Sequence, residues 1–114
     1  EMQRSLVGSE MCIRDSINDY LQTYNISMAF MACTGVTMKS GLTNASAEEY
    51  ITKKAIAENA NSMILLADHS KFGRISLMTY SSMEKLDAIV TDQPLPEEYD
   101  SFCQEHGIRV MTID

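Results

Sequence analysis

The fold of this chain is read first from the stretch Leu65-Leu66-Ala67-Asp68-His69-Ser70-Lys71-Phe72-Gly73, in which an apolar run ends abruptly in polar residues. The apolar residues 63–67 predict a short buried strand, and the polar residues after them predict a loop at its carboxyl end. That loop carries a carboxylate on Asp68, a hydroxyl on Ser70 and an ammonium on Lys71. Open α/β sheets bind ligands at this end of their strands, so the pattern predicts a ligand site here.

The spacing of apolar residues predicts that strands and helices alternate along the chain. Ser46 and Glu49 form a Ser-x-x-Glu capping box that opens a helix, and Pro96 suits the first turn of another helix that Gly107 ends. Strands alternating with helices imply an α/β fold, a mostly parallel sheet with covering helices. In chain order the expected elements are helix 17–24, strand 26–33, loop 34–45, helix 46–60, strand 63–67, loop 68–73, strand 75–80, strand 86–90, helix 96–106 and strand 108–113.

Composition and charge exclude several classes of function. With 114 residues, of which 45% are hydrophobic, the chain has the size of one domain and can bury a core. Its net charge of −7 argues against direct binding to a nucleic-acid backbone, because such binding requires an excess of Lys and Arg. No apolar run approaches the roughly 20 residues that span a bilayer, and no signal peptide is recognisable. We therefore expect a cytoplasmic protein without a membrane segment.

The cysteines and histidines do not predict a metal or cofactor site. Cys12, Cys33 and Cys103 are an odd number with no close pair, and neither a Cys-x-x-Cys motif nor zinc-ligand spacing occurs. Cys33 and Cys103 are best interpreted as small buried hydrophobic residues with reduced thiols. Neither His69 nor His106 has a nucleophile or metal partner nearby in sequence. No cofactor and no metal are expected.

The polar residues of the 68–73 loop each have a structural and a functional interpretation. Lys71 directly follows a buried strand, where its ammonium can reach a phosphate as a point charge; the alternative is a solvated loop lysine. Asp68 either closes the turn by accepting backbone N–H groups, or orients Lys71 and accepts sugar hydroxyls. Both interpretations stay open for both residues.

A second group of candidates lies in the glycine-containing stretch before the capped helix. Gly35, Gly41 and Thr43 have the pattern of a loop that lets the backbone approach an anion near the positive end of a helix. The alternative is an ordinary connecting loop. Lys53 is either a surface lysine paired with Glu49 one helical turn earlier or, if the helix faces the cleft, a further cation of the site.

Residues 17–114 resemble the effector-sensing domain of DeoR-type bacterial transcriptional repressors, and four motifs in the correct order carry the resemblance. The sequence departs from the family at Thr34, where members usually have an amide or carboxylate, although a hydroxyl also donates and accepts hydrogen bonds. Acidic and basic pairs, Glu48-Glu49 and Lys53-Lys54, also fall where the family has them. The four motifs are strand and turn Met28–Val36, the Gly-Leu-Thr loop Ser40–Asn44, the Asp-x-Ser-Lys-Phe turn Asp68–Phe72, and the strand end Leu86–Asp92.

The resemblance implies a fold like that of ribose-phosphate and glucosamine-phosphate isomerases, and a domain that binds a phosphorylated sugar or polyol to modulate operator binding. It also implies a homo-oligomer. Lys71 is the expected contact for the phosphate. One alternative is a sugar-phosphate isomerase, which is disfavoured because Thr34 replaces the acidic residue that isomerases carry in the corresponding turn. Another alternative is a stand-alone binding or oligomerisation module. The effector-binding residues expected are Lys71, Asp68, Ser70, Thr34, Gly35, Gly41, Thr43 and Lys53.

The amino-terminal segment is expected to be foreign to the domain. Residues 5–15 resemble a peptide that recurs when sequencing-adapter DNA is translated, so residues 1–15 are predicted to be non-native. The alternative is a genuine segment, since the family carries a Ser-Leu-Val-Gly stretch near this point. Residues 16–114 are then the carboxyl-terminal part of the sensor domain. The winged helix-turn-helix and a Gly-Gly-Thr-Thr phosphate loop are expected outside this chain, and operator contact is expected only through that missing domain.

Overall fold

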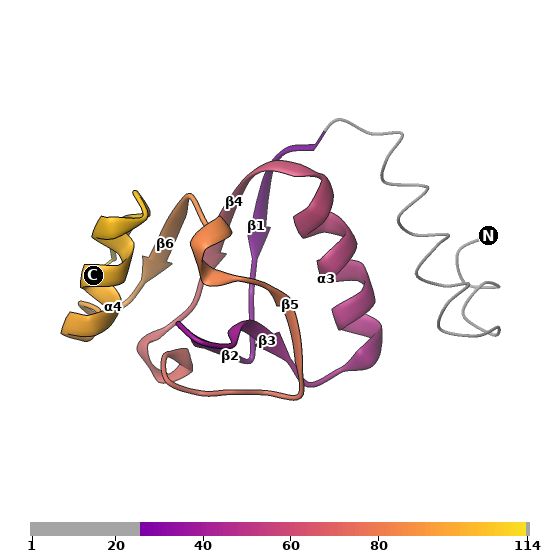
Figure 1. The fold of residues 1–114 in the computed structure, drawn as a ribbon, viewed down its shortest axis with the longest axis horizontal. Coiled ribbons are helices and arrows are strands. Elements are labelled where there is room, and N and C mark those ends of the chain that lie inside the picture. The colour runs from indigo at the N-terminus through magenta and orange to yellow at the C-terminus, as the bar shows by residue number, and fades with distance from the viewer. Residues whose placement is uncertain (1–25, 114) are drawn as a thin grey trace, which may run out of the picture.

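Four parallel strands form the larger sheet in the computed structural model, which describes residues 26–113 (Figure 1). Their order is β1 (Ile26–Met31), β4 (Ala60–Leu66), β6 (Ala88–Thr91) and β7 (Arg109–Thr112). Since all pairs are parallel, the carboxyl ends of the four strands lie along one edge of the sheet. The predicted α/β class with a mostly parallel sheet is confirmed.

Two of the predicted helices connect these strands along the chain. Helix α3 (Ala47–Asn59) connects β1 to β4 through the chain, and its cap residue Ser46 accepts a hydrogen bond from the backbone N–H of Glu49 at 3.3 Å. Helix α4 (Glu97–Glu105) connects β6 to β7, with Pro96 immediately before its first turn. Gly107 has a φ of +69°, the left-handed conformation that commonly ends a helix. The predicted helix 17–24 and the predicted non-native segment 1–15 lie outside the described residues.

A second, antiparallel sheet corrects the prediction that residues 34–45 form a loop. These residues contain β2 (Gly35–Thr37) and β3 (Gly41–Asn44), which form a hairpin, and β3 also pairs with β5 (Met78–Ser81). The two hairpin strands have only three and four residues and no alternation of polar and apolar positions, because every one of their residues is buried. Their pairing with β5, more than thirty residues later, is a long-range contact that a local pattern does not contain.

The structure also moves two predicted strand boundaries. Strand β4 begins at Ala60, three residues before the apolar run. Strand β5 begins at Met78 and not at Ile75, and the apolar side chains of Ile75 and Leu77 are 66% and 81% exposed. Two short 3-10 helices, η1 (His69–Lys71) and η2 (Met83–Lys85), complete the described elements. Neither α3 nor α4 is long and apolar enough to cross a membrane.

The core lies on one face of the parallel sheet. Alternate residues of the strands, such as Met31, Leu65 and Ile89, point into it and pack with residues of α4 and of the antiparallel sheet. Figure 1 shows the antiparallel strands and the two helices around the parallel strands. The intervening strand residues point to the opposite face, where Phe30 is 61% exposed and Leu66 44%. Among the described residues 26–113, the core therefore covers one face of the sheet, and the other face carries exposed apolar side chains.

Candidate functional site

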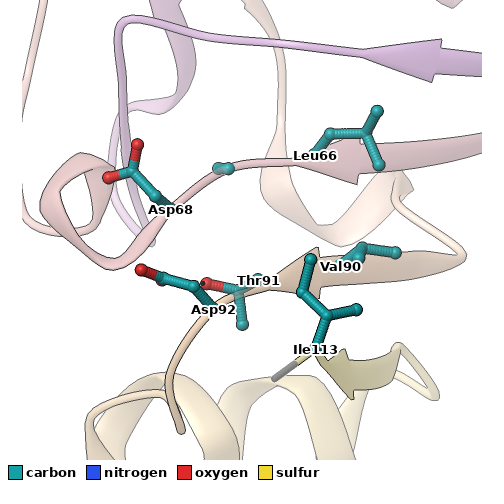
Figure 2. Close-up of a pocket in the computed structure, with 7 residues that line it drawn as sticks. Leu66, Asp68, Val90, Thr91, Asp92 and Ile113 are labelled. Atoms are coloured by element: carbon teal, nitrogen blue, oxygen red, sulfur yellow. Dashed lines mark hydrogen bonds between the residues drawn. The ribbon is translucent and has the colours of Figure 1, made fainter.

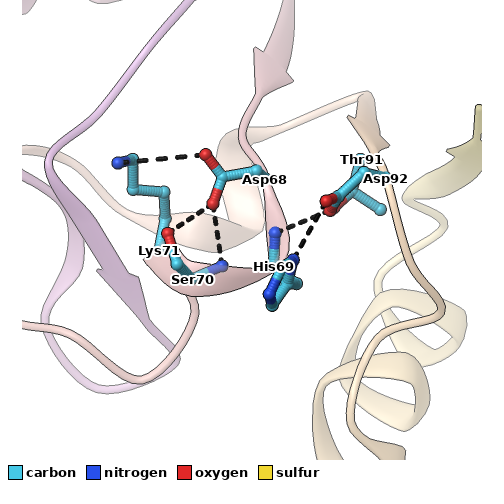
Figure 3. Close-up of polar contacts among 6 residues, drawn as sticks. All are labelled: Asp68, His69, Ser70, Lys71, Thr91 and Asp92. Atoms are coloured by element: carbon cyan, nitrogen blue, oxygen red, sulfur yellow. Dashed lines mark hydrogen bonds and ion pairs between the residues drawn. The ribbon is translucent and has the colours of Figure 1, made fainter.

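The turn after β4 gathers Asp68, Ser70 and Lys71 at the carboxyl edge of the parallel sheet (Figure 3). The carboxylate of Asp68 accepts the backbone N–H of Ser70 at 2.8 Å and also accepts the Ser70 hydroxyl. Its second oxygen, Oδ2, lies 3.9 Å from the ammonium Nζ of Lys71. The hydrogen bonds from Ser70 hold the pKa of Asp68 below its ordinary value, so this carboxylate is a charged acceptor at neutral pH.

The carboxylate of Asp92, which follows the neighbouring strand β6, holds the same turn through His69. Asp92 follows β6 directly, and its two oxygens lie 2.8 Å from the backbone N of His69 and 2.9 Å from the ring nitrogen Nδ1 of His69. The hydrogen bond to the His69 side chain is the main reason that the pKa of Asp92 is below its ordinary value. Figure 3 shows His69 turned toward Asp92, while Lys71 extends to the opposite side of the turn.

The far end of the turn is anchored to the core. The ring of Phe72 meets the ring of Tyr99 edge to face, with the centroids 5.7 Å apart. The backbone N of Gly73 donates to the carbonyl of Val36 at 2.9 Å, and Gly73 adopts a φ of +91°. With Asp92 at one end and these contacts at the other, the backbone that carries Ser70 and Lys71 is held at both ends.

Positive charge gathers near the end of β1 as well. Burial raises the pKa of the Cys33 thiol to about 11, and the positive charges of Lys53 and Lys71 oppose that rise. The Lys53 ammonium lies beside this strand end, since it donates to the carbonyl of the adjacent Ala32 at 2.8 Å. The side chain of Lys71 is 31% exposed. Lys71 is thus partly shielded from water but can still be reached by a ligand. Among the described residues its ion-pair partner is Asp68, whose Oδ2 lies 3.9 Å from the Lys71 ammonium.

Lys53 is bound more tightly into the fold. Its ammonium donates to the carbonyl of Ala32 at 2.8 Å and to Oδ1 of Asn44 at 3.0 Å, and it lies 3.8 Å from Glu49. An ammonium has three N–H donors, and two of them are used by Ala32 and Asn44, while Glu49 at 3.8 Å adds an ion pair. The side chain ties α3 to β1 and β3. The hydroxyl of Tyr80 also donates to the Ala32 carbonyl, at 2.8 Å.

Two other predicted site residues, Thr34 and Thr43, lie outside this turn. Thr34 is exposed in the bend that connects β1 to β2, immediately before Gly35. Thr43 is fully buried: its hydroxyl donates to the carbonyl of Gly35 at 2.8 Å and accepts the backbone N–H of Ser76 at 2.9 Å. Its hydroxyl therefore serves the antiparallel sheet, whereas Asp68, Ser70 and Lys71 are brought together at the edge.

Close backbone packing explains the two glycines of the hairpin. A Cβ at Gly35 would lie 2.4 Å from the carbonyl oxygen of Arg74, and a Cβ at Gly41 would lie 2.3 Å from that of Ser81. Gly41 also has a φ of +78°, which residues with a side chain rarely adopt. Both glycines allow the hairpin to approach the chain around β5, which is a structural requirement independent of any anion.

A shallow pocket of about 290 Å³ opens beside the two carboxylates (Figure 2). Asp68, Thr91 and Asp92 line its polar end, and the apolar side chains of Leu66, Val90 and Ile113 line the rest. Within residues 26–113, no group of three or more His, Cys, Asp and Glu side chains is arranged to hold a metal ion. The chemistry that this edge offers is hydrogen-bond acceptance by carboxylates and attraction of an anion by Lys71.

Sequence reasoning missed Asp92 and His69 as part of the site. The signal was available, because Asp68 and Asp92 each follow an apolar strand, and polar residues at the carboxyl ends of neighbouring parallel strands lie at the same edge of a sheet. Asp92 was assigned only to a strand end. His69 and Asp92 are 23 positions apart in the chain.

Comparison with known families and proteins agrees with this architecture. The model of the DeoR C-terminal sensor domain matches residues 7–93, which is most of the chain. The chain therefore belongs to the DeoR C-terminal sensor-domain family, whose fold is the isomerase-like one that the sequence motifs implied.

Three curated relatives with similar sequences are transcriptional regulators or repressors by name. It is 51% identical over 90 residues to the HTH-type transcriptional regulator IolR of Bacillus subtilis, which covers 79% of this chain and 36% of IolR. It is 29% identical over 111 residues to the glycerol-3-phosphate regulon repressor of Escherichia coli, covering 92% and 44%. It is 25% identical over 99 residues to the HTH-type transcriptional repressor GlcR of Bacillus subtilis, covering 87% and 38%. The chain spans about two fifths of the length of these relatives.

Proposed function

We propose that this chain is the effector-sensing part of a cytoplasmic, DNA-binding transcriptional repressor of sugar metabolism. Its effector is a phosphorylated sugar or polyol, and operator DNA is bound by a separate domain of the whole protein. The names of the relatives support the regulatory role, since all three are transcriptional regulators or repressors. The name of one of them, the glycerol-3-phosphate regulon repressor, supports a link to a phosphorylated polyol.

The placement of Lys71 is the observation that carries the proposal. Its ammonium lies at the carboxyl edge of a parallel sheet, on a turn held at both ends, and its described ion-pair partner Asp68 is 3.9 Å away. A phosphate provides stronger and shorter contacts than this exposed ion pair. Asp68 and the Ser70 hydroxyl then bind sugar hydroxyls, as does Thr34, which is exposed in the bend after the neighbouring strand β1.

The carboxylates favour binding over catalysis. An isomerase needs a general base whose pKa lies near the operating pH. The pKa values of Asp68 and Asp92 are lowered by hydrogen bonds, which makes both carboxylates weaker bases. The proposed role is therefore binding, without a catalytic role for either carboxylate. Effector binding changes operator affinity by favouring one conformation of a homo-oligomeric repressor, which requires different effector affinities in the two states.

Calorimetric titration of the whole protein that contains this chain, with phosphorylated and unphosphorylated compounds, tests the proposal. Glycerol 3-phosphate, a hexose 6-phosphate, inorganic phosphate and the free hexose are the probes. We expect a phosphorylated compound to bind and the free hexose not to bind. Lys71→Ala should weaken that binding by about tenfold or more, because a charge-assisted contact is lost. Lys39→Ala is the matched control, since Lys39 is an exposed lysine on the turn between β2 and β3.

Two results would contradict the proposal. Equal affinity of wild type and Lys71→Ala would remove Lys71 from the site. Absence of binding by every phosphorylated compound would favour the stand-alone interaction module, and turnover of a sugar phosphate would favour the isomerase.

A further inference from the structure

A second pocket lies between helix α3 and the segment that contains β5 and η2. Its volume is about 270 Å³, and it shares no lining residue with the turn after β4 or with the pocket beside Asp68 and Asp92. Helix α3 packs against β5 on this side of the molecule (Figure 1). We call it the α3–η2 pocket, and its lining residues are Lys54, Ala57, Glu58, Thr79, Tyr80, Ser81, Ser82 and Lys85.

The α3–η2 pocket is positively charged in an otherwise acidic chain. Its lining contains two lysines and one glutamate, which gives a net charge of +1, whereas the whole chain carries −7. Glu84, the residue next to Lys85, does not line the pocket, and its Oε2 lies 3.6 Å from Nε2 of His106. The lining therefore attracts an anion, although the chain as a whole repels one.

The two lysines of the pocket are available to a ligand. Lys85 is exposed, and its side chain makes no hydrogen bond or ion pair with any residue in the described range 26–113. Lys54 is 37% exposed and forms one long ion pair, in which Nζ lies 3.9 Å from Oε2 of Glu58. A lysine that precedes its glutamate by four residues is also the less favourable order of such a helical pair.

One hydroxyl of the lining is available as well. The side chain of Ser82, which is exposed and directly precedes η2, makes no capping hydrogen bond to that short helix. The hydroxyls of Thr79 and Ser81 are already used, since they donate to the carbonyls of Ser40 and Ser82 at 2.8 and 3.1 Å. The pocket therefore offers an anion two ammonium groups and one hydroxyl donor.

We propose that the α3–η2 pocket is a second anion site that binds a phosphate group, either inorganic phosphate or the phosphoryl end of a phosphomonoester. Two ammonium groups match the charge of a phosphomonoester, which is about −1.5 to −2 at pH 7. Lysine binds phosphate as a point charge and requires no planar, bidentate geometry. Lys54 approaches from α3, and Ser82 and Lys85 approach from the segment after β5, so oxygens on two sides of a tetrahedral phosphate are contacted.

A phosphate bound in this way links α3 to η2. The backbone N–H groups of Lys85 and Leu86 donate to the carbonyls of Ser82 and Met83 at 3.4 and 3.1 Å, and these bonds hold η2 together. Fixing Ser82 and Lys85 on one anion stabilises this short helix. Ligand binding should therefore slow hydrogen exchange in residues 82–86.

Hydrogen-exchange mass spectrometry of the whole protein that contains this chain tests the proposal. The probes are inorganic phosphate and glycerol 3-phosphate, with potassium chloride at equal ionic strength as the reference. All proteins carry Lys71→Ala, so that the proposed effector turn does not contribute. We expect at least one probe to slow exchange in residues 82–86. Lys85→Gln should raise the probe concentration that gives half of this effect by about tenfold or more, because a charge-assisted contact is lost.

Two further variants separate anion binding from a structural role of the lysines. Glu58→Gln removes the one carboxylate of the lining and should lower the half-effect concentration by about twofold to fivefold, because Glu58 no longer competes for Lys54. Lys39→Gln is the matched control and should leave that concentration unchanged, since Lys39 is an exposed lysine on the turn between β2 and β3.

The two probes also identify the source of the phosphate. A lower half-effect concentration for glycerol 3-phosphate supports a phosphomonoester as the ligand, and a lower one for inorganic phosphate supports the free ion. No effect of either probe on residues 82–86, or equal responses of Lys85→Gln and Lys39→Gln, would overturn the proposal. Failure of the effector site is a separate result, because it is measured by calorimetry at Lys71.

Discussion

The carboxylate of Asp92 accepts two hydrogen bonds from His69, from the backbone N at 2.8 Å and from the ring nitrogen Nδ1 at 2.9 Å. This contact joins the end of β6 to the turn that follows β4. Because the same turn carries Ser70 and Lys71, Asp92 helps to determine where the Lys71 ammonium lies relative to the sheet. The residue that orients the proposed site is therefore on a different strand from the residues that form it.

Asp92→Asn should loosen the turn without unfolding the chain. The amide oxygen of Asn still accepts the backbone N–H of His69, but the amide nitrogen can only donate to Nδ1, which requires the other tautomer of the ring, and the negative charge of the acceptor is lost. We expect faster hydrogen exchange at the backbone amides of His69 and Ser70, measured by NMR. Asp100→Asn on the exposed surface of α4 is the control and should leave both amides unchanged. Equal exchange rates in the two variants would show that Asp92 does not hold the turn.

The turn should also loosen at acid pH. Hydrogen bonds lower the pKa values of Asp68 and Asp92 below the ordinary value of 3.8. A carboxylate with a lowered pKa contributes stability that is fully present above its unfolded value, near 4, and is lost as pH falls through the lowered pKa. We expect the NMR shifts of the His69 and Ser70 amides to change with midpoints below 3.8, and the His69 transition to disappear in Asp92→Asn. A midpoint at or above 3.8 would contradict the hydrogen-bonded geometry.

Gly41→Ala should be more destabilising than Gly107→Ala. Both glycines have positive φ, +78° and +69°, so each substitution costs about 1 to 2 kcal/mol for the left-handed backbone. A Cβ at Gly41 would also lie 2.3 Å from the carbonyl oxygen of Ser81, whereas a Cβ at Gly107 would meet no atom within 4 Å. Overpacking adds about 1 to 3 kcal/mol at Gly41 alone. Urea unfolding measures the difference, and equal losses would show that the hairpin shifts to admit the methyl group.

Local patterns predicted most of the parallel sheet and its helices, because those elements have long apolar runs and recognisable caps. The apolar run 63–67 identified β4, although the strand ends at Leu66, and Ser46 with Glu49 identified the start of α3. The hairpin of β2 and β3 was missed, since it is stabilised by pairing with β5 and by the buried hydroxyl of Thr43, both of which depend on distant residues. The same limit applies to the site: Asp68 and Lys71 lie on one turn and were predicted together, whereas the partner of His69 comes from another strand.

Thr43→Val should lower the free energy of unfolding by about 2 to 4 kcal/mol, because it leaves a buried acceptor and a partly buried donor unpaired. These are the Gly35 carbonyl and the Ser76 N–H, which the Thr43 hydroxyl joins at 2.8 and 2.9 Å. Thr79→Val is the control: the Thr79 hydroxyl donates to the Ser40 carbonyl at 2.8 Å on the exposed surface, where water replaces it, so the loss should stay within about 0.5 kcal/mol. Urea unfolding measures both changes. If Thr43→Val leaves stability unchanged but abolishes sugar-phosphate binding, the hydroxyl of Thr43 belongs to the effector site and the hairpin opens to expose it.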